Sequence, residues 1–279
     1  MDLDIKGTRI HVAVSEEQGT EKEPSLLFIH GAAGNASIWD FQADYFKGKH
    51  RVYRLELPGH GKSSSDGEDE ISAYAQWVRL AIERLFPSGV FALIGHSMGG
   101  AIALELAAGS LNGLQALVLV GTGAKLGVTP IIFTMLRENP DDFFHTIDRT
   151  AFCEQTFPPT RDRFIAVARA CPLATISKDF KACDRFDTCE NLKNIKVPTL
   201  ILCGEQDLLT PVKHSKYLHE GISNSSLVII PKAGHMVMSE QPDLLNRALE
   251  IFLTTTPSRE NQKAAQGWAE RINTEGINS

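Results

Sequence analysis

The sequence predicts an α/β protein built on a mostly parallel, doubly wound sheet that carries an inserted helical cap. Two observations predict this architecture. Short segments that are apolar almost throughout alternate with segments of helical period, as expected for strands connected by helices. The alternation is then interrupted over residues 123–191, where aromatic residues and prolines accumulate before the last two strand-like segments.

The N-terminal segment predicts a β-hairpin. Residues 3–14 alternate apolar and polar side chains on both sides of Gly7. Alternation indicates strands with one face in solvent, so we expect this hairpin at an edge of the sheet.

The other predicted strands are continuous apolar runs. Such runs suit strands that are covered on both faces, as in a parallel sheet. They are SLLFIH (25–30), VYRLEL (52–57), VFALIG (90–95), QALVLVG (115–121), PTLILCG (198–204) and SLVIIP (226–231).

Helical patterns lie between and after these runs. Residues 71–86 carry one apolar stripe, which predicts an amphipathic helix. Residues 101–109 predict a buried helix that ends at Gly109. Residues 240–253 predict a further helix with Pro242 in its first turn.

The predicted cap divides the core into residues 1–122 and 192–256. It holds eight of the chain's 14 phenylalanines and suggests short helices joined at prolines. Its basic residues are balanced by acidic ones, so a polyanionic ligand such as a coenzyme A ester is not indicated. Residues 257–279 form a polar C-terminal extension, either a loosely docked helix or a tail.

Composition narrows the class of partner and the compartment. The 279 residues carry a net charge of -6, which disfavours nucleic acid and anionic membranes as main partners. No apolar run approaches the ~20 residues of a membrane span, and the acidic N-terminus does not resemble a signal peptide. Five cysteines without a CxxC pair favour reduced thiols, so we expect a cytoplasmic protein. We further expect a monomer or homodimer that needs no metal and no cofactor.

The segment GHSMGG (95–100) joins a predicted strand directly to a predicted helix. A serine at the apex of so sharp a turn is forced to positive φ, and the residues two before and two after it come close together. Gly95 and Gly99 occupy those two places around Ser97, which completes a G-x-S-x-G nucleophile elbow. The turn would also place the N–H of Met98 at a helix N-terminus, where it can stabilise an oxyanion. Alone, the motif could equally be a glycine-rich corner without chemistry.

Partners for Ser97 occur after other strands. His235, in the loop after the last strand, is the expected general base because this loop shares the carboxyl edge of the sheet with Ser97. Asp207, three residues beyond the preceding strand, is expected to orient His235, with Glu205 as the competing carboxylate. The second oxyanion donor is expected to be the N–H of Ala32, in the HGAAG turn.

Together these segments resemble the α/β-hydrolase fold superfamily. HG (30–31), LPGHGKS (57–63), GHSMGG (95–100), GEQDLLTP (204–211) and AGHMVMSEQP (233–242) look closest to its capped serine esterase, lactonase and C–C-bond-hydrolase branch. The chain order Ser97, Asp207, His235 is the order that accompanies this elbow. Two rival motifs are disfavoured: GHGKS lacks the first glycine of a phosphate loop, and GTGAKLG has loose dinucleotide-binding spacing.

We therefore expect a carboxylesterase-like serine hydrolase for small-molecule esters with small to medium, largely apolar groups. Thioester, lactone and C–C substrates would use the same triad and stay open. A non-catalytic ligand-binding protein of the same fold is the alternative from another class.

Overall fold

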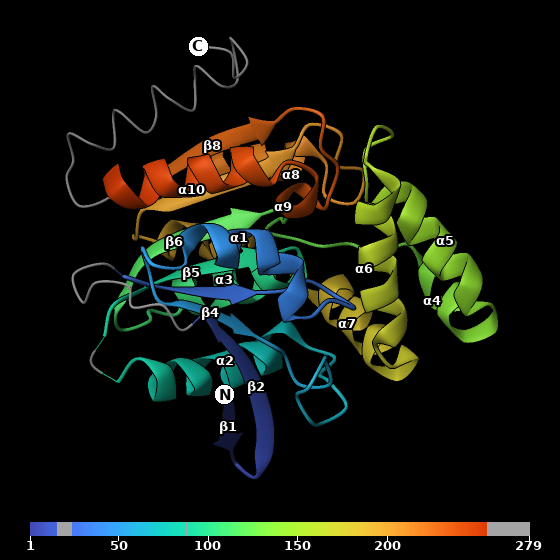
Figure 1. The fold of residues 1–279 in the computed structure, drawn as a ribbon, viewed down its shortest axis with the longest axis horizontal. Coiled ribbons are helices and arrows are strands. Elements are labelled where there is room, and N and C mark those ends of the chain that lie inside the picture. The colour runs from blue at the N-terminus through green and yellow to red at the C-terminus, as the bar shows by residue number, and fades with distance from the viewer. Residues whose placement is uncertain (16–23, 88, 256–279) are drawn as a thin grey trace.

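The computed structural model describes residues 1–15, 24–87 and 89–255, which fold around one eight-stranded sheet (Figure 1). Its spatial order is β1-β2-β4-β3-β5-β6-β7-β8. The strands are β1 (Asp2–Ile5), β2 (Thr8–Ser15), β3 (Ser25–Ile29), β4 (Val52–Leu55), β5 (Phe91–His96), β6 (Leu114–Val120), β7 (Thr199–Gly204) and β8 (Ser225–Ile230).

The sheet is parallel except at one edge. β1 and β2 form the expected hairpin, and β2 pairs antiparallel with β4. From β4 to β8 every pairing is parallel, so the carboxyl ends of these strands meet at one edge. The predicted mostly parallel fold is confirmed.

Helices cover both faces of this sheet. Successive strand residues pack into opposite clusters: Leu26 and Phe28 face one layer, whereas Leu27 and Ile29 face the other. The first layer contains α1 (Asp40–Phe46), preceded by η1 (Ala36–Trp39), and α10 (Pro242–Thr255), preceded by α9 (Val237–Glu240). The second contains α2 (Ile71–Leu85), α3 (Met98–Ala108) and α8 (Val212–Gly221). Burial on both faces explains why the strands are apolar throughout.

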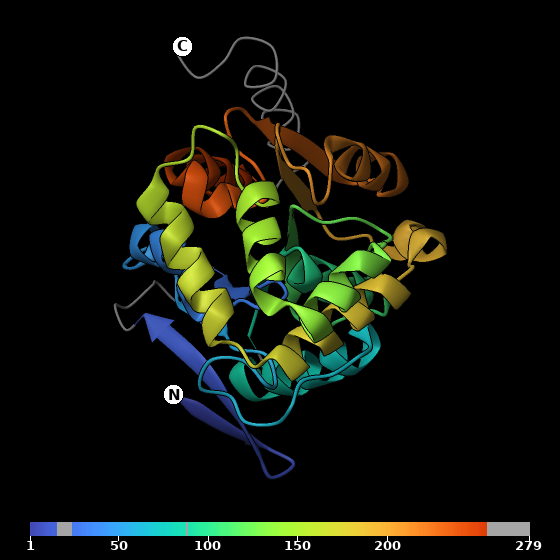
Figure 2. The same ribbon diagram turned by 90° about the vertical axis from the view of Figure 1, so that its right-hand side faces the viewer.

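The cap consists of four helices between β6 and β7. They are α4 (Pro130–Glu138), α5 (Pro140–Thr150), α6 (Pro158–Ala170) and α7 (Leu173–Arg185), followed by η2 (Cys189–Asn194). α4, α5 and α6 each begin with a proline in the first turn, as the prolines at the joints predicted. Figures 1 and 2 show the four helices beside the sheet, at the edge where the parallel strands end.

Three α-helices of the core were not expected from the sequence, namely α1, α8 and the four-residue α9. The predicted C-terminal extension lies outside the described residues. Within the described ranges, none of the helices combines the length and apolarity that crossing a bilayer requires.

Candidate active site

Ser97 lies at the apex of the turn between β5 and α3. Its φ is 53° and its ψ -117°, a strained conformation for a residue other than glycine that costs about 1–3 kcal/mol. A side chain at Gly95 would collide with the backbone of Gly99, and one at Gly100 would come within 2.6 Å of Thr122. The turn is fixed by two hydrogen bonds: the N–H of Ser97 donates to Val120 O at 2.9 Å, and the Thr122 hydroxyl donates to Ser97 O at 2.8 Å.

Asp207 and His235 meet at the same sheet edge. Asp207 Oδ2 lies 2.9 Å from His235 Nδ1, and both side chains are buried. Asp207 Oδ1 also accepts the N–H groups of Leu209 (2.9 Å) and Thr210 (2.8 Å). Glu205, the competing carboxylate, is exposed to solvent.

The environment of Asp207 favours an ionised carboxylate. Burial by itself raises the pKa of Asp207. The charge of His235 and the hydrogen bonds from His235 and Thr210 together lower this pKa by more than burial raises it, so the net shift is downward. Thr210 takes part through its hydroxyl, which donates to Asp207 Oδ2 at 2.7 Å. Thr210 was not expected from the sequence, although an Asp that opens a turn and is followed by a Thr is a signal for side-chain hydrogen bonds of this kind.

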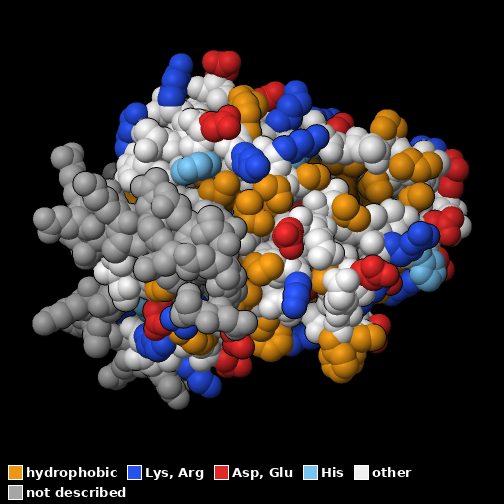
Figure 3. All heavy atoms as spheres, turned by 90° about the horizontal axis from the view of Figure 1, so that it is seen from above, with side chains coloured by type: hydrophobic (Ala, Val, Ile, Leu, Met, Phe, Trp, Pro, Cys, Tyr) orange, Lys and Arg blue, Asp and Glu red, His pale blue; other side chains and the backbone are white. Residues whose placement is uncertain are grey.

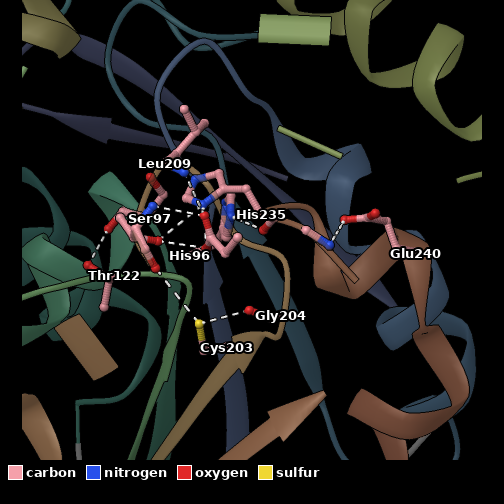
Figure 4. Close-up of polar contacts among 11 residues, drawn as sticks. His96, Ser97, Thr122, Cys203, Gly204, Leu209, His235 and Glu240 are labelled. Atoms are coloured by element: carbon pink, nitrogen blue, oxygen red, sulfur yellow. Dashed lines mark hydrogen bonds and ion pairs between the residues drawn. The ribbon is translucent and has the colours of Figure 1, made fainter. Parts of the chain in front are cut away.

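The loop that carries His235 is held by the cap. The N–H groups of His235 and Met236 both donate to Ala151 O, at 2.9 and 3.1 Å. Glu240 accepts the N–H of Gly234 on Oε1 (2.9 Å) and the N–H of Cys153 on Oε2 (2.8 Å). Glu240 therefore bridges the histidine loop and the cap. Figure 4 shows Glu240 beside the loop that carries His235. This carboxylate was also missed, because its partners are backbone groups.

His96 packs directly against His235, with ring centroids 4.6 Å apart (Figure 4). Its Nε2 lies 3.0 Å from His235 O and donates to it, because a carbonyl oxygen can only accept. Burial and, to a smaller extent, the nearby His235 together lower the pKa of His96 to about 3. His96 thus stays neutral and does not compete with its neighbour for a proton.

Ala32 and Met98 flank Ser97, one from the loop after β3 and the other from the start of α3. Met98 is the first residue of α3, and Ala32 lines the same cavity as Ser97. No protein group in the described chain accepts a hydrogen bond from the N–H of either residue. The next N–H along the loop, that of Ala33, is occupied, because it donates to Asp179 at 2.9 Å.

A cavity of about 340 Å³ connects these groups to the cap. Ser97 and His235 lie at its core side, although the described part of the chain holds no hydrogen bond between Ser97 Oγ and His235. Such bonds often tighten only when substrate is bound. The cap side is apolar, with lining residues that include Ile132, Phe143, Ile147, Phe164, Ala168 and Phe180. Of the described residues that line the cavity, none is Asp, Glu, Lys or Arg.

The outer surface repeats this apolar character on the cap side. Seen from above, hydrophobic side chains gather around a hollow at the end of the molecule where the cap lies (Figure 3). Over the described ranges, no group of three or more His, Cys, Asp or Glu side chains is arranged to hold a metal ion.

Comparison with known proteins places this site in a wider context. The model of the Alpha/beta hydrolase family matches residues 26–248. A pimeloyl-(acyl-carrier protein) methyl ester esterase of Nitrosomonas europaea is 25% identical over 240 residues, which cover 80% of this chain and 93% of that protein.

Solved structures agree with the family match. A structure described as a thermophilic esterase superposes with a TM-score of 0.78 at 32% identity, covering 92% of this chain and 98% of the other. The enol-lactonase of Burkholderia xenovorans LB400 superposes with a TM-score of 0.82 at 22% identity, covering 91% and 100% of the two chains. At that identity the likeness is one of fold.

Proposed function

Because the chain belongs to the Alpha/beta hydrolase family, we propose that it is a serine esterase that works through an acyl-enzyme, with Ser97, Asp207 and His235 as its triad. The chain is a carboxylic ester hydrolase, like the esterases that it resembles. The observation that carries the triad assignment is the strained Ser97 facing one cavity with His235, whose Nδ1 lies 2.9 Å from Asp207.

In the proposed mechanism, Ser97 Oγ attacks the ester carbonyl carbon while its proton passes to His235 Nε2. Asp207 accepts from Nδ1, which fixes the tautomer and stabilises the imidazolium that forms. The N–H groups of Ala32 and Met98 are the proposed donors to the oxyanion. His235 then protonates the leaving alcohol as its bond to the acyl carbon breaks. In the second half-reaction His235 takes a proton from water, the water oxygen attacks the acyl carbon, and His235 returns the proton to Ser97 Oγ as the carboxylic acid leaves.

The lining of the cavity supports uncharged substrates. A volume of about 340 Å³ with no charged side chain along it favours small to medium apolar groups over a carboxylate or phosphate. The curated relative from Nitrosomonas is named for a methyl ester on an acyl-carrier-protein chain. For this chain we propose free esters with an apolar acyl or alkyl group in the cavity; lactones, thioesters and C–C substrates are competing substrates for the same triad.

The test is a panel of p-nitrophenyl esters of increasing chain length with Ser97→Ala alongside the wild type. We expect kcat to fall by at least about 10⁴-fold in Ser97→Ala, because the nucleophile is lost while the fold is kept. A fluorophosphonate probe should label the wild type and not the variant. Ser223→Ala, at an exposed serine before β8, is the matched control and should keep both activity and labelling. Equal, slow hydrolysis by all three proteins without labelling would support the non-catalytic alternative.

The wider organisation belongs to the same proposal. Residues 1–122 and 192–256 are proposed as the catalytic core and residues 123–191 as the cap. The five cysteines are free thiols, which favours a reducing compartment, and we propose a cytoplasmic monomer or homodimer.

A further inference from the structure

Asp179 is a buried carboxylate of the cap that faces the core. It lies on α7 and is fully inaccessible to solvent. Its Oδ2 accepts the N–H of Ala33 at 2.9 Å and lies 2.8 Å from His60 Nε2, and its Oδ1 accepts the hydroxyl of Tyr74 at 2.6 Å. One side chain of the cap therefore joins three separate segments of the core.

The partner His60 carries a positive charge in this arrangement. Its Nδ1 lies 3.0 Å from Pro58 O, and its Nε2 faces the Asp179 carboxylate. The Pro58 carbonyl oxygen can only accept, and Asp179 Oδ2 is the oxygen that also accepts the Ala33 N–H, so both ring nitrogens donate, which only the imidazolium can do. Burial by itself lowers the pKa of His60, but the charge and the hydrogen bond of Asp179 raise it to about 10. The GHGKS segment thus contributes the cation of a buried ion pair.

The neighbouring His30 has the opposite state. Its Nδ1 lies 2.8 Å from Gly31 O and donates to it, while its Nε2 accepts the N–H of Leu57 at 3.0 Å, so the ring is neutral. Burial, and then the charge of His60, lowers the pKa of His30 well below its ordinary value. Because His30 is neutral, it adds no second positive charge beside His60, and the imidazolium of His60 pairs with Asp179.

Ala33 is the point at which this ion pair reaches the active site. Its φ is 56°, a left-handed conformation that an alanine adopts only when its surroundings hold it there. The hydrogen bond to Asp179 fixes the peptide between Ala32 and Ala33. The loop passes so close to the elbow that a methyl group on Gly31 would come within 3.1 Å of Ser97 Cβ.

We propose that Asp179, paired with His60, is a positioning residue that holds the loop of residues 30–34 so that the Ala32 N–H can serve the oxyanion. The inference rests on the proposed esterase function. It makes the cap part of the catalytic machinery, because the carboxylate that fixes the oxyanion loop comes from α7. The competing interpretation is a buried ion pair that contributes to folding only.

Two sets of variants separate these interpretations. Asp179→Ala removes the acceptor of the Ala33 N–H, and Asp179→Asn restores an acceptor of the same size without the charge. If Asp179→Ala does not fold with an unpaired His60 charge, the double variant His60→Leu/Asp179→Leu removes both charges together, a replacement that buried ion pairs commonly tolerate. Tyr74→Phe is the matched control, because it removes the donor to Oδ1 and leaves the Ala33 contact.

The kinetic result expected is a loss in kcat rather than in KM. Because losing an oxyanion donor costs about 10²–10³-fold, a displaced donor should lower kcat by about 10- to 100-fold in Asp179→Ala or the double variant. KM should stay within about threefold of wild type, because the cavity that binds the apolar group is unchanged. Asp179→Asn should recover most of kcat, and Tyr74→Phe should keep it even if its Tm falls.

A trifluoromethyl ketone gives a readout that folding alone does not move. In its adduct, Ser97 Oγ bonds to the carbonyl carbon, the hydroxyl proton passes to His235, and the ketone oxygen becomes an oxyanion. Its inhibition constant should rise in parallel with the loss of kcat, while that of the corresponding neutral alcohol stays constant. A folded double variant with wild-type kcat and wild-type ketone affinity would overturn the inference. A wild type without ester hydrolysis or probe labelling would instead refute the proposed function.

Discussion

Ala168→Phe should shorten the acyl or alkyl chain that the enzyme accepts. Ala168 lies on α6, is 1% exposed and lines the cavity of about 340 Å³ that also contains Ser97. The new side chain has six carbons more than alanine, and the space that it can occupy is the space proposed for the substrate. The phenyl ring therefore takes the space that the far end of a long acyl or alkyl chain would fill, while the groups around Ser97 stay unchanged.

The size of the effect follows from the apolar lining. Each methylene group that enters such a cavity contributes about 0.8 kcal/mol, which is about fourfold in kcat/KM. In the wild type, kcat/KM should rise by this factor per methylene until the cavity is full. A phenyl ring that excludes three methylenes costs a long substrate about 2.4 kcal/mol, or about 60-fold, and leaves the acetate ester nearly unaffected.

The assay measures kcat/KM for p-nitrophenyl acetate, butyrate, hexanoate, octanoate and decanoate. Ala166→Phe is the matched control, because Ala166 is an exposed residue of the same helix and adds the same ring outside the cavity. We expect the optimum of Ala168→Phe to move to shorter chains and that of Ala166→Phe to stay in place. Parallel profiles for all three proteins would show that the substrate chain does not occupy this cavity.

Two further predictions concern the charged groups. Asp207→Asn should lower kcat by about 10⁴-fold, because the neutral amide cannot hold the reactive tautomer of His235. The control is Glu205→Gln, at an exposed residue nearby, which should keep full activity in the same ester assay. The His60–Asp179 pair should make the free energy of unfolding fall as pH rises. In the folded state the pKa of His60 is raised to about 10, whereas in the unfolded chain it lies near 6.5. The pair therefore stabilises the fold fully below pH 6.5 and loses this contribution as the pH rises through 10. Between these values the folded state holds one proton more than the unfolded state, so this pair should lower the free energy of unfolding by about 1.4 kcal/mol per pH unit. Urea denaturation between pH 6.5 and 8.5 should show this decrease in the wild type and not in His60→Leu/Asp179→Leu; identical slopes would contradict the assigned charge state.

The strands were predictable because each buried strand is a short, continuous run of apolar residues in the sequence. The run at 90–95 is apolar at every position. In the structure Leu93 faces one helical layer and Ile94 faces the other, so both faces of the strand are covered. Helix α8 escaped prediction because its sequence, VKHSKYLHEG, buries only Ser215 and Leu218 and so has no apolar stripe. Helix α1 spans only Asp40–Phe46, too short for a period to stand out.

The candidate site divides in the same way. Ser97, Asp207 and His235 each follow a strand, and parallel strands must end at one edge, so their meeting could be expected from the sequence alone. Asp179 carries no such signal. It is one acidic residue in a cap helix, and its partners Ala33 and His60 lie 146 and 119 positions away along the chain. Only the packed structure shows that this carboxylate is the buried one.

The cap holds two loops of the candidate site by comparable means. On one side Asp179 accepts the Ala33 N–H beside the proposed oxyanion donor, and on the other Ala151 O accepts the N–H groups of His235 and Met236. Backbone contacts of this kind fix loop geometry without contributing chemistry, so sequence motifs do not reveal them. A cap that only covered the substrate could be exchanged between related enzymes with a change in specificity alone. Because these contacts fix the loops of Ser97's partners, we expect cap exchange here to lower kcat even for the smallest ester, unless the acceptors at positions 151 and 179 are kept.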